Sequence, residues 1–200
     1  MVEKINAPDK DQAVKEDILG SAERVFQKWG LNKTTMEDIA SEAQKGKSTL
    51  YYYFKSKEEI FEAVITRQIE QLLMSAKKSV EHVSSSKEKL KLYVISSLKE
   101  IHKFGMVFSI VRDEIKGNRS YVDKISQKIK DSEKDFIKDI LLEGVASKEI
   151  NFKIEELEIV SETILGIIYA LHMFLFRDNR DDLETSQKIE ITARLIANGM

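Results

Sequence analysis

Cysteine is missing from this sequence, and proline occurs only once, at Pro8. The chain can therefore form no disulfide, and it has no thiolate metal ligand and no thiol nucleophile, which is compatible with a reducing cytosol. Residues 9–200 lack the residue that most strongly interrupts a helix, and the eight glycines provide few turn signals for a sheet. These absences predict an all-α fold.

Long hydrophobic runs are missing as well. The most apolar stretch, TILGIIYALHMFLF, covers only residues 163–176, whereas a membrane-spanning helix needs about 20 such residues. The polar N-terminus, MVEKINAPDKDQAVKED, lacks the apolar segment of a secretion signal. With 42% hydrophobic and 33% charged residues, the composition is that of a globular protein. We therefore expect a cytoplasmic protein with no membrane partner, in which 163–176 forms a buried helix.

Apolar residues recur at helical spacing along most of the chain. The first such stretch begins near Val14 and ends at Gly30, where a C-terminal cap belongs. Thr35 is placed to cap a short helix, and Ser56 with Glu59 resembles a capping box at the start of a long one. Further helices are expected at about 87–104, 106–116, 120–146, 154–177 and 183–198.

The hexapeptide QKGKST, residues 44–49, contains the Gly-Lys-Ser run of a phosphate-binding loop. That loop also needs a glycine five residues earlier and a strand before it. Ser41 occupies the position of the earlier glycine, and the helix-like segment MEDIASEA takes the place of the strand. A nucleotide-hydrolysing enzyme is therefore a remote alternative.

Two short helices joined by a tight turn containing glycine account for the same residues, an arrangement typical of a helix-turn-helix. Ile39, Ala40 and Ala43 give the first helix a packing face. Leu50 and Phe54, four residues apart, give one to the second helix. The three consecutive tyrosines that lie between these two cannot all be buried in so short a helix, so some of their hydroxyls must face solvent or a ligand.

Positive charge is concentrated in this segment. Residues 43–57 carry Lys45, Lys47, Lys55 and Lys57 and no acid, a net charge of +4. Because the whole chain carries −2, the remaining residues sum to −6. One small cationic face on an otherwise acidic chain is the distribution expected for a surface that meets a polyanion.

The segment TTMEDIASEAQKGKSTLYYYFKSKEEIF (34–61), with AERVFQKWGLNKTT before it, resembles the DNA-binding domain of the TetR family of bacterial transcriptional regulators. The resemblance covers roughly residues 15–65, and many positions match in order. Residues 1–10 are expected to form a flexible tail. The resemblance implies an N-terminal three-helix helix-turn-helix DNA-binding domain at 11–56 and a C-terminal helical ligand-binding and dimerisation domain at 57–200.

Roles for single residues follow from this resemblance. Thr35 matches a helix cap that also touches phosphate, and Lys57 matches a phosphate-contacting lysine at the start of the fourth helix. Lys47 and Ser48 stand where the family reads bases. The residues that stand where the family grips the DNA backbone are Thr49, Tyr51, Tyr52 and Tyr53.

The turn of the helix-turn-helix departs from the family pattern. Gln44, Lys45 and Gly46 replace the usual Gly-Val-Ser. The stem of Lys45 can still pack against the core while its ammonium reaches phosphate. Gln44 and Lys45 therefore complete the predicted DNA-binding residues.

The resemblance also implies that the last two long helices pair with their copies in a second subunit. A two-fold homodimer would place two reading helices about one DNA turn apart, matching a palindromic operator. The residues predicted for the dimer interface are Ile164, Ile168, Leu171, Leu175, Ile189, Ala193 and Ile196.

A pocket for a small-molecule inducer is expected in the larger domain, mainly apolar with a few polar groups. Simple core packing is the alternative for each of its candidate residues. The residues predicted to line it are Phe104, Met106, Phe108, Tyr121, Phe136, Tyr169 and His172.

We therefore expect a sequence-specific DNA-binding regulator, a repressor that an inducer releases from its operator. A helical protein-interaction module that has lost DNA binding is the alternative. His82, His102 and His172 are widely spaced and lack nearby acids at ligand spacing, so no metal site is expected. No grouping of Ser, Asp and His indicates catalysis, so neither a cofactor nor an enzymatic activity is predicted.

Overall fold

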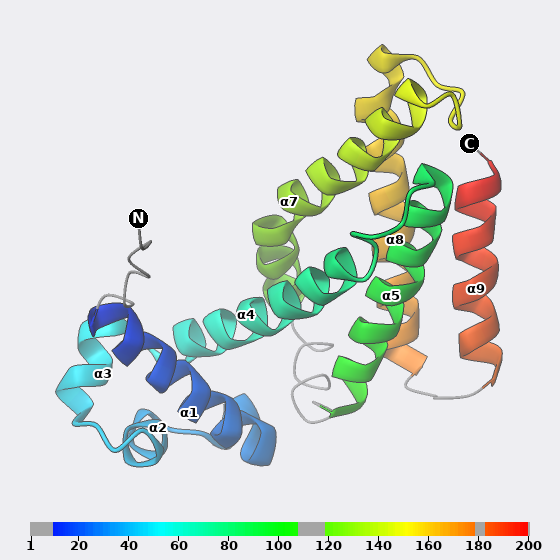
Figure 1. Ribbon diagram of the computed structural model, residues 1–200. Helices are drawn as coiled ribbons and strands as arrows, with labels where there is room; N and C mark the ends of the chain where they lie inside the picture. The colour runs from blue at the N-terminus through cyan, green and yellow to red at the C-terminus, as the bar shows by residue number, and fades with distance from the viewer. Residues whose placement is uncertain (1–9, 108–118, 179–182, 200) are drawn as a thin grey trace, which may run out of the picture.

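The computed structural model describes residues 10–107, 119–178 and 183–199, and within these ranges it contains helices and connecting turns but no strand. The all-α fold is therefore confirmed (Figure 1). The helix expected at 106–116 lies almost entirely outside the described residues. The helices are α1 (Lys10–Lys33), α2 (Met36–Glu42), α3 (Lys47–Tyr53), α4 (Lys57–Lys78), α5 (Ser86–Val107), α7 (Arg119–Ala146), the 3-10 helix η1 (Ile154–Glu156), α8 (Leu157–Asp178) and α9 (Leu183–Asn198).

Local sequence signals set several helix ends. Gly30 takes a φ of 74° within α1, a left-handed conformation that glycine adopts without a Cβ clash, and the helix kinks there. Thr35 caps α2 as expected. Ser56 caps α4 by accepting the N–H of Glu59, but the Glu59 carboxylate accepts the N–H of Lys55 at 2.7 Å. The reciprocal half of the expected capping box therefore lies one residue earlier in the chain.

Two hydrophobic clusters form the interior. The first contains residues of α1, α2, α3 and α4, together with Phe104 of α5. Within it the rings of Phe26 and Phe61 meet edge to face, with their centroids 5.2 Å apart. The second lies among α5, α7, α8 and α9. Helix α4 contributes to both, with Ile60 near its start in the first cluster and Ala76 near its end in the second. In Figure 1 this helix runs from the α1–α3 group to the larger group of helices.

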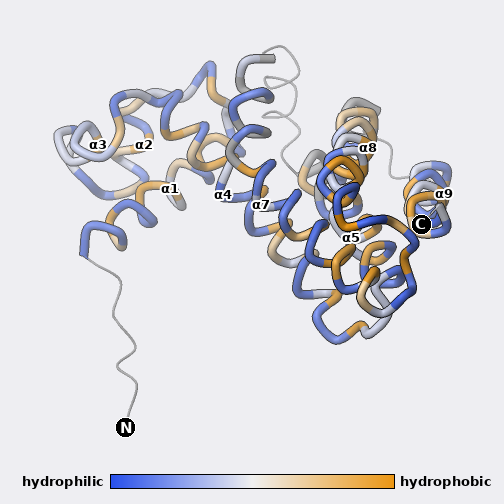
Figure 2. Tube along the Cα trace, turned by 90° about the horizontal axis from the view of Figure 1, so that it is seen from above, coloured by the Kyte–Doolittle hydropathy of each residue, from blue (hydrophilic) through white to orange (hydrophobic). Residues whose placement is uncertain are grey.

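Helix α8 is buried on one face only. Ile164 and Ile168 lie in the core, whereas Ile159 and Ile167 on the same helix are exposed. The expectation that 163–176 forms a buried helix therefore holds for one face of α8 in the single subunit. The segment Ile154–Phe174 is long and apolar enough to cross a membrane by length and composition, and 33% of it is buried. Figure 2 shows apolar residues along α8 as well as along α5 and α9.

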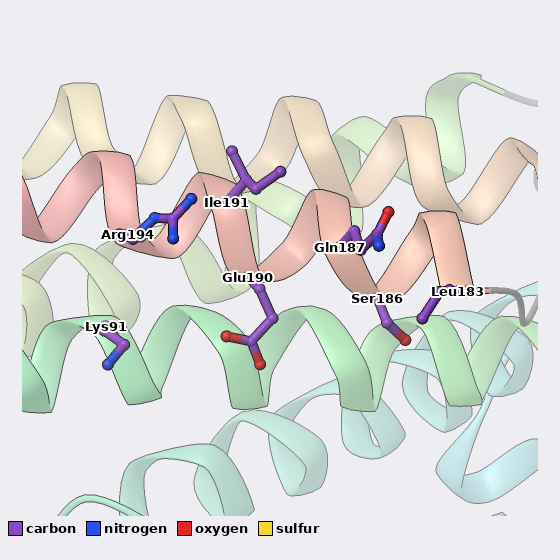
Figure 3. Close-up of a pocket in the computed structure, with 7 residues that line it drawn as sticks. All are labelled: Lys91, Leu183, Ser186, Gln187, Glu190, Ile191 and Arg194. Carbon is purple, nitrogen blue, oxygen red and sulfur yellow. The ribbon is translucent and has the colours of Figure 1, made fainter.

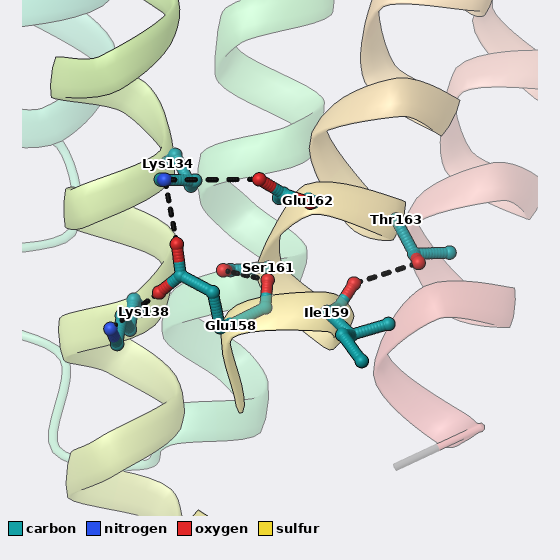
Figure 4. A network of polar contacts seen from close by, with 7 residues as sticks. All are labelled: Lys134, Lys138, Glu158, Ile159, Ser161, Glu162 and Thr163. Carbon is teal, nitrogen blue, oxygen red and sulfur yellow. Dashed lines mark hydrogen bonds and ion pairs between the residues drawn. The ribbon is translucent and has the colours of Figure 1, made fainter. Parts of the chain in front are cut away.

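Ion pairs fasten α7 to α8. The Glu158 carboxylate accepts hydrogen bonds from Lys134 at 2.7 Å and from Lys138 at 2.5 Å (Figure 4). Glu162, one turn further along α8, lies 3.8 Å from the Lys134 ammonium. The Lys134 hydrogen bond, followed by that of Lys138, lowers the pKa of the Glu158 carboxyl to about 2.

Candidate nucleic-acid interface

The first short helix of the N-terminal unit begins in a capping box. The Thr35 hydroxyl accepts the N–H of Asp38 at 3.2 Å, and the Asp38 carboxylate accepts the backbone N–H of Thr35 at 2.9 Å. These contacts with Thr35 lower the pKa of Asp38, so its carboxylate stays ionised at the positive end of α2. The first residues of α2 are thereby fixed in place.

The turn between α2 and α3 bends at a residue that is not glycine. Gln44 takes a φ of 52°, in the left-handed region, whereas Gly46 has the extended values φ −69° and ψ 148° and is the N-cap of α3. The N–H of Lys45 donates to the carbonyl of Ala40 at 3.0 Å, which closes the turn. The glycine expected in the turn is therefore present, but the strained position is Gln44.

Helix α3 buries one face and exposes the other. Leu50 is fully buried and Phe54 is 3% exposed, as the spacing predicts. Tyr51 and Tyr52 are 53% and 76% exposed. Tyr53 is half-buried, and its hydroxyl donates to Asp11 of α1 at 3.0 Å. Lys47 and Ser48, at the N-terminal end of this exposed face, are exposed, and Thr49 is half-buried.

Two lysines, one in the turn and one at the start of α3, form ion pairs with acids of α1 and α2. Lys47 forms an ion pair with Glu37 in the first turn of α2. The ammonium of Lys45 lies 2.8 Å from the carboxylate of Asp17 on α1. These groups are partly exposed, so water and salt screen the pairs and phosphate groups can compete with the acids.

Lys57 is held by backbone carbonyls. Its ammonium donates to the carbonyls of Leu31 and Thr34, each at 2.9 Å, and it lies 3.4 Å from that of Asn32. The side chain thus fastens the start of α4 to the connection between α1 and α2. Contact of this ammonium with phosphate remains a prediction.

Comparison with known proteins identifies this unit. Residues 18–64 match the family model described as bacterial regulatory proteins of the tetR family. The chain is 31% identical over 144 residues to the transcriptional repressor KstR2 of Mycolicibacterium smegmatis, covering 70% of this chain and 69% of that protein. The chain belongs to the TetR family of bacterial transcriptional regulators. It is a helix-turn-helix protein that binds DNA in a sequence-specific manner.

Other relatives extend the likeness beyond the DNA-binding unit. The regulator is 28% identical over 138 residues to the helix-turn-helix transcriptional regulator YhgD of Bacillus subtilis, covering 68% of this chain and 71% of YhgD. Its fold matches the crystal structure of FadR from Bacillus subtilis in complex with stearoyl-CoA, with a TM-score of 0.68 and 19% identity. That match covers 92% of this chain and 98% of FadR, so both parts of the fold are shared.

The residues predicted for an inducer pocket are spread over different parts of the regulator. Phe104 lies in the first hydrophobic cluster, 5% exposed. Phe136, Tyr169 and His172 lie at the second cluster, where the rings of Tyr169 and His172 have centroids 6.1 Å apart. The predicted residues outside what the structure describes are Phe108 and the side chains of Met106 and Tyr121.

A buried acid beside these residues was missed from the sequence. Glu133 of α7 is 1% exposed, and the hydroxyl of Tyr93 donates to it at 2.7 Å. Burial raises the pKa of the Glu133 carboxyl, and the hydrogen bond from Tyr93 opposes this in part. The sequence does contain a signal, because Glu133 lies four residues from both Ile129 and Ile137 and so interrupts an apolar stripe.

Most residues predicted for the dimer interface lie in the core of the subunit itself. This is a correction, because side chains with so little exposed surface cannot form the face that a partner covers. Leu171 is half-buried, and the side chain of Leu175 lies outside the described residues. The residues in the core, all at most 9% exposed, are Ile164, Ile168, Ile189, Ala193 and Ile196.

Different apolar side chains of α8 and α9 are exposed. Ile159, Ile167 and Phe174 are 69%, 42% and 49% exposed on α8, and Ile191 and Leu195 are 46% and 68% exposed on α9. A shallow groove of about 450 Å³ runs beside α9, lined by residues of α9 and by one of α5 (Figure 3). These residues are Lys91, Leu183, Ser186, Gln187, Glu190, Ile191 and Arg194.

Proposed function

We propose that the regulator is a cytoplasmic repressor that binds a palindromic operator as a homodimer and leaves it when a small molecule binds to the helical part. In this proposal residues 11–56 form the DNA-binding domain and residues 57–200 the ligand-binding and dimerisation domain. Repression accords with the relationship to KstR2, a transcriptional repressor.

The exposed face of α3 is the observation that carries the DNA-binding part of the proposal. Leu50 and Phe54 anchor α3 to the hydrophobic core. The opposite face, with Lys47, Ser48 and Tyr52, can therefore approach base edges and phosphates. Ser48 and the tyrosine hydroxyls can hydrogen-bond to phosphate or bases, and Lys47 can donate to guanine. The predicted DNA-binding residues lie on α3, on the turn before it, at the N-cap of α2 (Thr35) or at the first residue of α4 (Lys57).

The exposed stripes of α8 and α9 support the dimer. Ile159, Ile167 and Phe174 follow one another at helical spacing, and the small residues Gly166 and Ala170 lie exposed beside them. A contiguous apolar face of this kind on a helical protein favours a second helix pair as its cover. Ile191 and Leu195 provide the matching stripe on α9. A two-fold axis would pair these faces and produce a four-helix bundle.

The inducer would act by binding one conformation better than another. A ligand shifts the operator affinity only by the difference between its affinities for the two conformations. FadR of Bacillus subtilis holds stearoyl-CoA within the same fold. In this proposal the ligand of the regulator binds in the helical part, and its chemistry must be inferred from the residues of this chain.

Fluorescence anisotropy on DNA from upstream of the regulator's own gene tests the proposal, with a scrambled duplex as control and at two salt concentrations. Tight, selective and salt-sensitive binding is expected, because phosphate contacts release counterions and base contacts add selectivity. Weak and equal binding to every duplex, persisting through selection from a random-sequence pool, would instead favour the helical interaction module.

A further inference from the structure

Among the described residues, three polar side-chain atoms of α7 and α8 are buried without a hydrogen-bond partner. They are Oε2 of Glu133, the hydroxyl of Tyr169 and Nε2 of His172. Glu133 is 1% exposed and His172 is 7% exposed. Buried polar groups in folded proteins are nearly always paired, so such atoms call for a partner.

These atoms belong to one cluster of side chains. The hydroxyl of Tyr93 on α5 donates to Oε1 of Glu133 at 2.7 Å, which leaves Oε2 free. The Tyr169 hydroxyl lies near the Glu133 carboxyl and lowers its pKa. The two groups are nevertheless not placed well enough to form a regular hydrogen bond. The rings of Tyr169 and His172 lie 6.1 Å apart, and those of Tyr93 and Phe136 lie 4.9 Å apart. Helices α5, α7 and α8 therefore meet around one carboxylate with aromatic walls.

The unpaired atoms are mainly hydrogen-bond acceptors. Burial raises the pKa of Glu133 and favours its protonated form, whereas a cation bound beside it favours the ionised form, whose Oε2 can only accept. Burial lowers the pKa of His172 to about 4, opposed by a hydrogen bond with the backbone of Ser97, so the imidazole is neutral near pH 7. Because its other nitrogen serves Ser97, Nε2 is left as an acceptor. A molecule that satisfies both acceptors has to supply N–H or O–H donors.

The buried charge of the cluster is that of Glu133. Lys77 of α4 is the cation that faces it, with its ammonium 5.0 Å from the centre of the Phe136 ring and hydrogen-bonded to Ser132 at 3.0 Å. The carboxylates of Glu133, Asp135 and Asp139 all act on that ammonium. Because the exposed Asp135 and Asp139 share this ammonium with Glu133, Lys77 neutralises the buried carboxyl only in part, which favours a positive ligand over an anionic one.

We propose that Glu133, Tyr169 and His172 form the anchoring end of a binding site for an organic cation with N–H donors on a flat apolar body. The ligand's N–H groups donate to Oε2 of Glu133 and to Nε2 of His172, and its body packs against the rings of Tyr93 and Phe136. This inference rests on the proposed function, because it names the chemical class of the inducer.

The position of Lys77 connects the site to the DNA-binding unit. A cation bound to Glu133 neutralises that carboxylate, so Lys77 is no longer attracted to it. The bound cation also repels the Lys77 ammonium. Lys77 lies in the last turn of α4, whose first residue, Lys57, is fastened to the connection between α1 and α2. Ligand binding therefore acts on the helix that links the two parts of the chain.

The test compares benzamidinium, benzamide and benzoate, which share one ring body and carry charges of +1, 0 and −1. Their binding to the purified full-length protein is measured by ligand-observed NMR titration without DNA. Benzamidinium is expected to bind at least tenfold more tightly than benzoate, with benzamide between them. Equal affinities, tightest binding of benzoate, or no binding of any probe would overturn the proposal. In the last case, internal water would be the partner of the unpaired atoms.

Glu133→Gln tests the anchor, because it keeps an acceptor for Tyr93 and removes the charge. It should weaken benzamidinium binding at least tenfold and leave benzoate binding no weaker. Glu143→Gln is the matched control on the same helix, since that exposed carboxylate pairs with Lys89 at 2.5 Å. If Glu133→Gln does not fold, Tyr169→Phe takes its place and should weaken benzamidinium severalfold. A folded variant with unchanged benzamidinium affinity would overturn the assignment.

The operator experiment keeps this proposal separate from the proposed function. Selective operator binding combined with equal binding of the three probes would refute the cation site and leave the repressor intact. Cation-selective binding that Glu133→Gln abolishes, with no selective DNA binding, would refute the repressor and leave the site intact.

Discussion

Lys47, the first residue of α3, forms an ion pair with Glu37 in the first turn of α2. Both side chains are about half exposed, at 52% and 56%. The residue predicted to read bases is therefore held by an acid that would itself lie near DNA phosphates. Such an acid orients the lysine and also opposes binding to any phosphate backbone.

Glu37→Gln should raise affinity for operator and scrambled DNA alike. An exposed pair of this kind contributes about 0.2–1 kcal/mol, so an increase of about 1.5- to 5-fold is expected in anisotropy titrations. Glu42→Gln is the control, because Glu42 also lies on α2 but pairs with Arg24 of α1 at 2.7 Å. A loss of operator affinity alone would mean that Glu37 contacts a base directly.

Lys57→Met should lower both stability and the salt dependence of DNA binding. The ammonium satisfies carbonyls of Leu31 and Thr34, and losing charged hydrogen bonds of this kind costs about 1–3 kcal/mol in the free energy of unfolding. Urea denaturation measures that loss. If Lys57 also contacts phosphate, the salt slope should flatten by about 0.9 per subunit.

Lys55→Met is the control for Lys57, because Lys55 is exposed and carries the same charge two residues earlier. An unchanged slope in folded Lys57→Met protein would show that the lysine only braces the start of α4.

Gln44→Gly should stabilise the regulator. The left-handed φ of 52° at Gln44 strains any residue that has a Cβ, so glycine should increase the free energy of unfolding by about 0.5–1 kcal/mol. Gln44→Ala removes the same polar side chain and keeps the Cβ, so it should give no such gain in urea denaturation. Equal effects of the two substitutions would mean that the side chain matters and the backbone conformation does not.

Stability should fall in acid because of Glu158. Its pKa is lowered from the ordinary 4.5 to about 2 by Lys134 and Lys138. Because the folded value lies below the unfolded one, the stabilisation is fully present above pH 4.5 and is lost as the pH falls towards 2. Urea midpoints of wild type and Glu158→Gln should therefore differ at neutral pH and converge near pH 2.

The exposed Glu155, just before Glu158 in sequence, provides the control for this pH dependence. Glu155→Gln should follow the wild-type curve throughout. A constant gap between wild type and Glu158→Gln down to the lowest pH would contradict the ion-pair explanation.

Ile167→Glu should separate the proposed dimer. A carboxylate placed on that apolar stripe would be buried without a partner, which costs about 3–5 kcal/mol and weakens association more than 100-fold. Sedimentation velocity measures the change, and circular dichroism should show an intact helical subunit. Leu142→Glu on α7 is the control, since Leu142 is 38% exposed but lies on another helix. Dissociation by both variants, or by neither, would place the interface elsewhere.

Much of the N-terminal unit could be predicted because its signals are local. The cap at Thr35, the break at Gly30 and the burial of Leu50 each depend on residues within one or two helical turns. The bend at Gln44 was not predictable in the same way. Glycine adopts the left-handed conformation more readily than glutamine, so Gly46 would be the expected position. The hydrogen bonds that close the turn instead place the left-handed conformation at Gln44.

The helical part was harder to predict because packing between distant segments decides it. Ile167 and Ile168 are neighbours of the same type in one apolar stretch, yet one is 42% exposed and the other is fully buried. Composition cannot tell which side of α8 meets α5. Glu133 likewise looks like a surface acid until α5 brings Tyr93 against it from 40 residues away.

The length of α4 gives small motions a large effect. Its 22 residues span about 33 Å at 1.5 Å per residue. A tilt of about 6° at the end that carries Ala76 and Lys77 would therefore displace the other end by about 3 Å, close to one base-pair step. Side chains of α3 that travel with that end would then face the next base pair. Because Phe104 of α5 packs in the first cluster, this contact would shift in the same rotation, so its packing is coupled to the base pair that α3 faces.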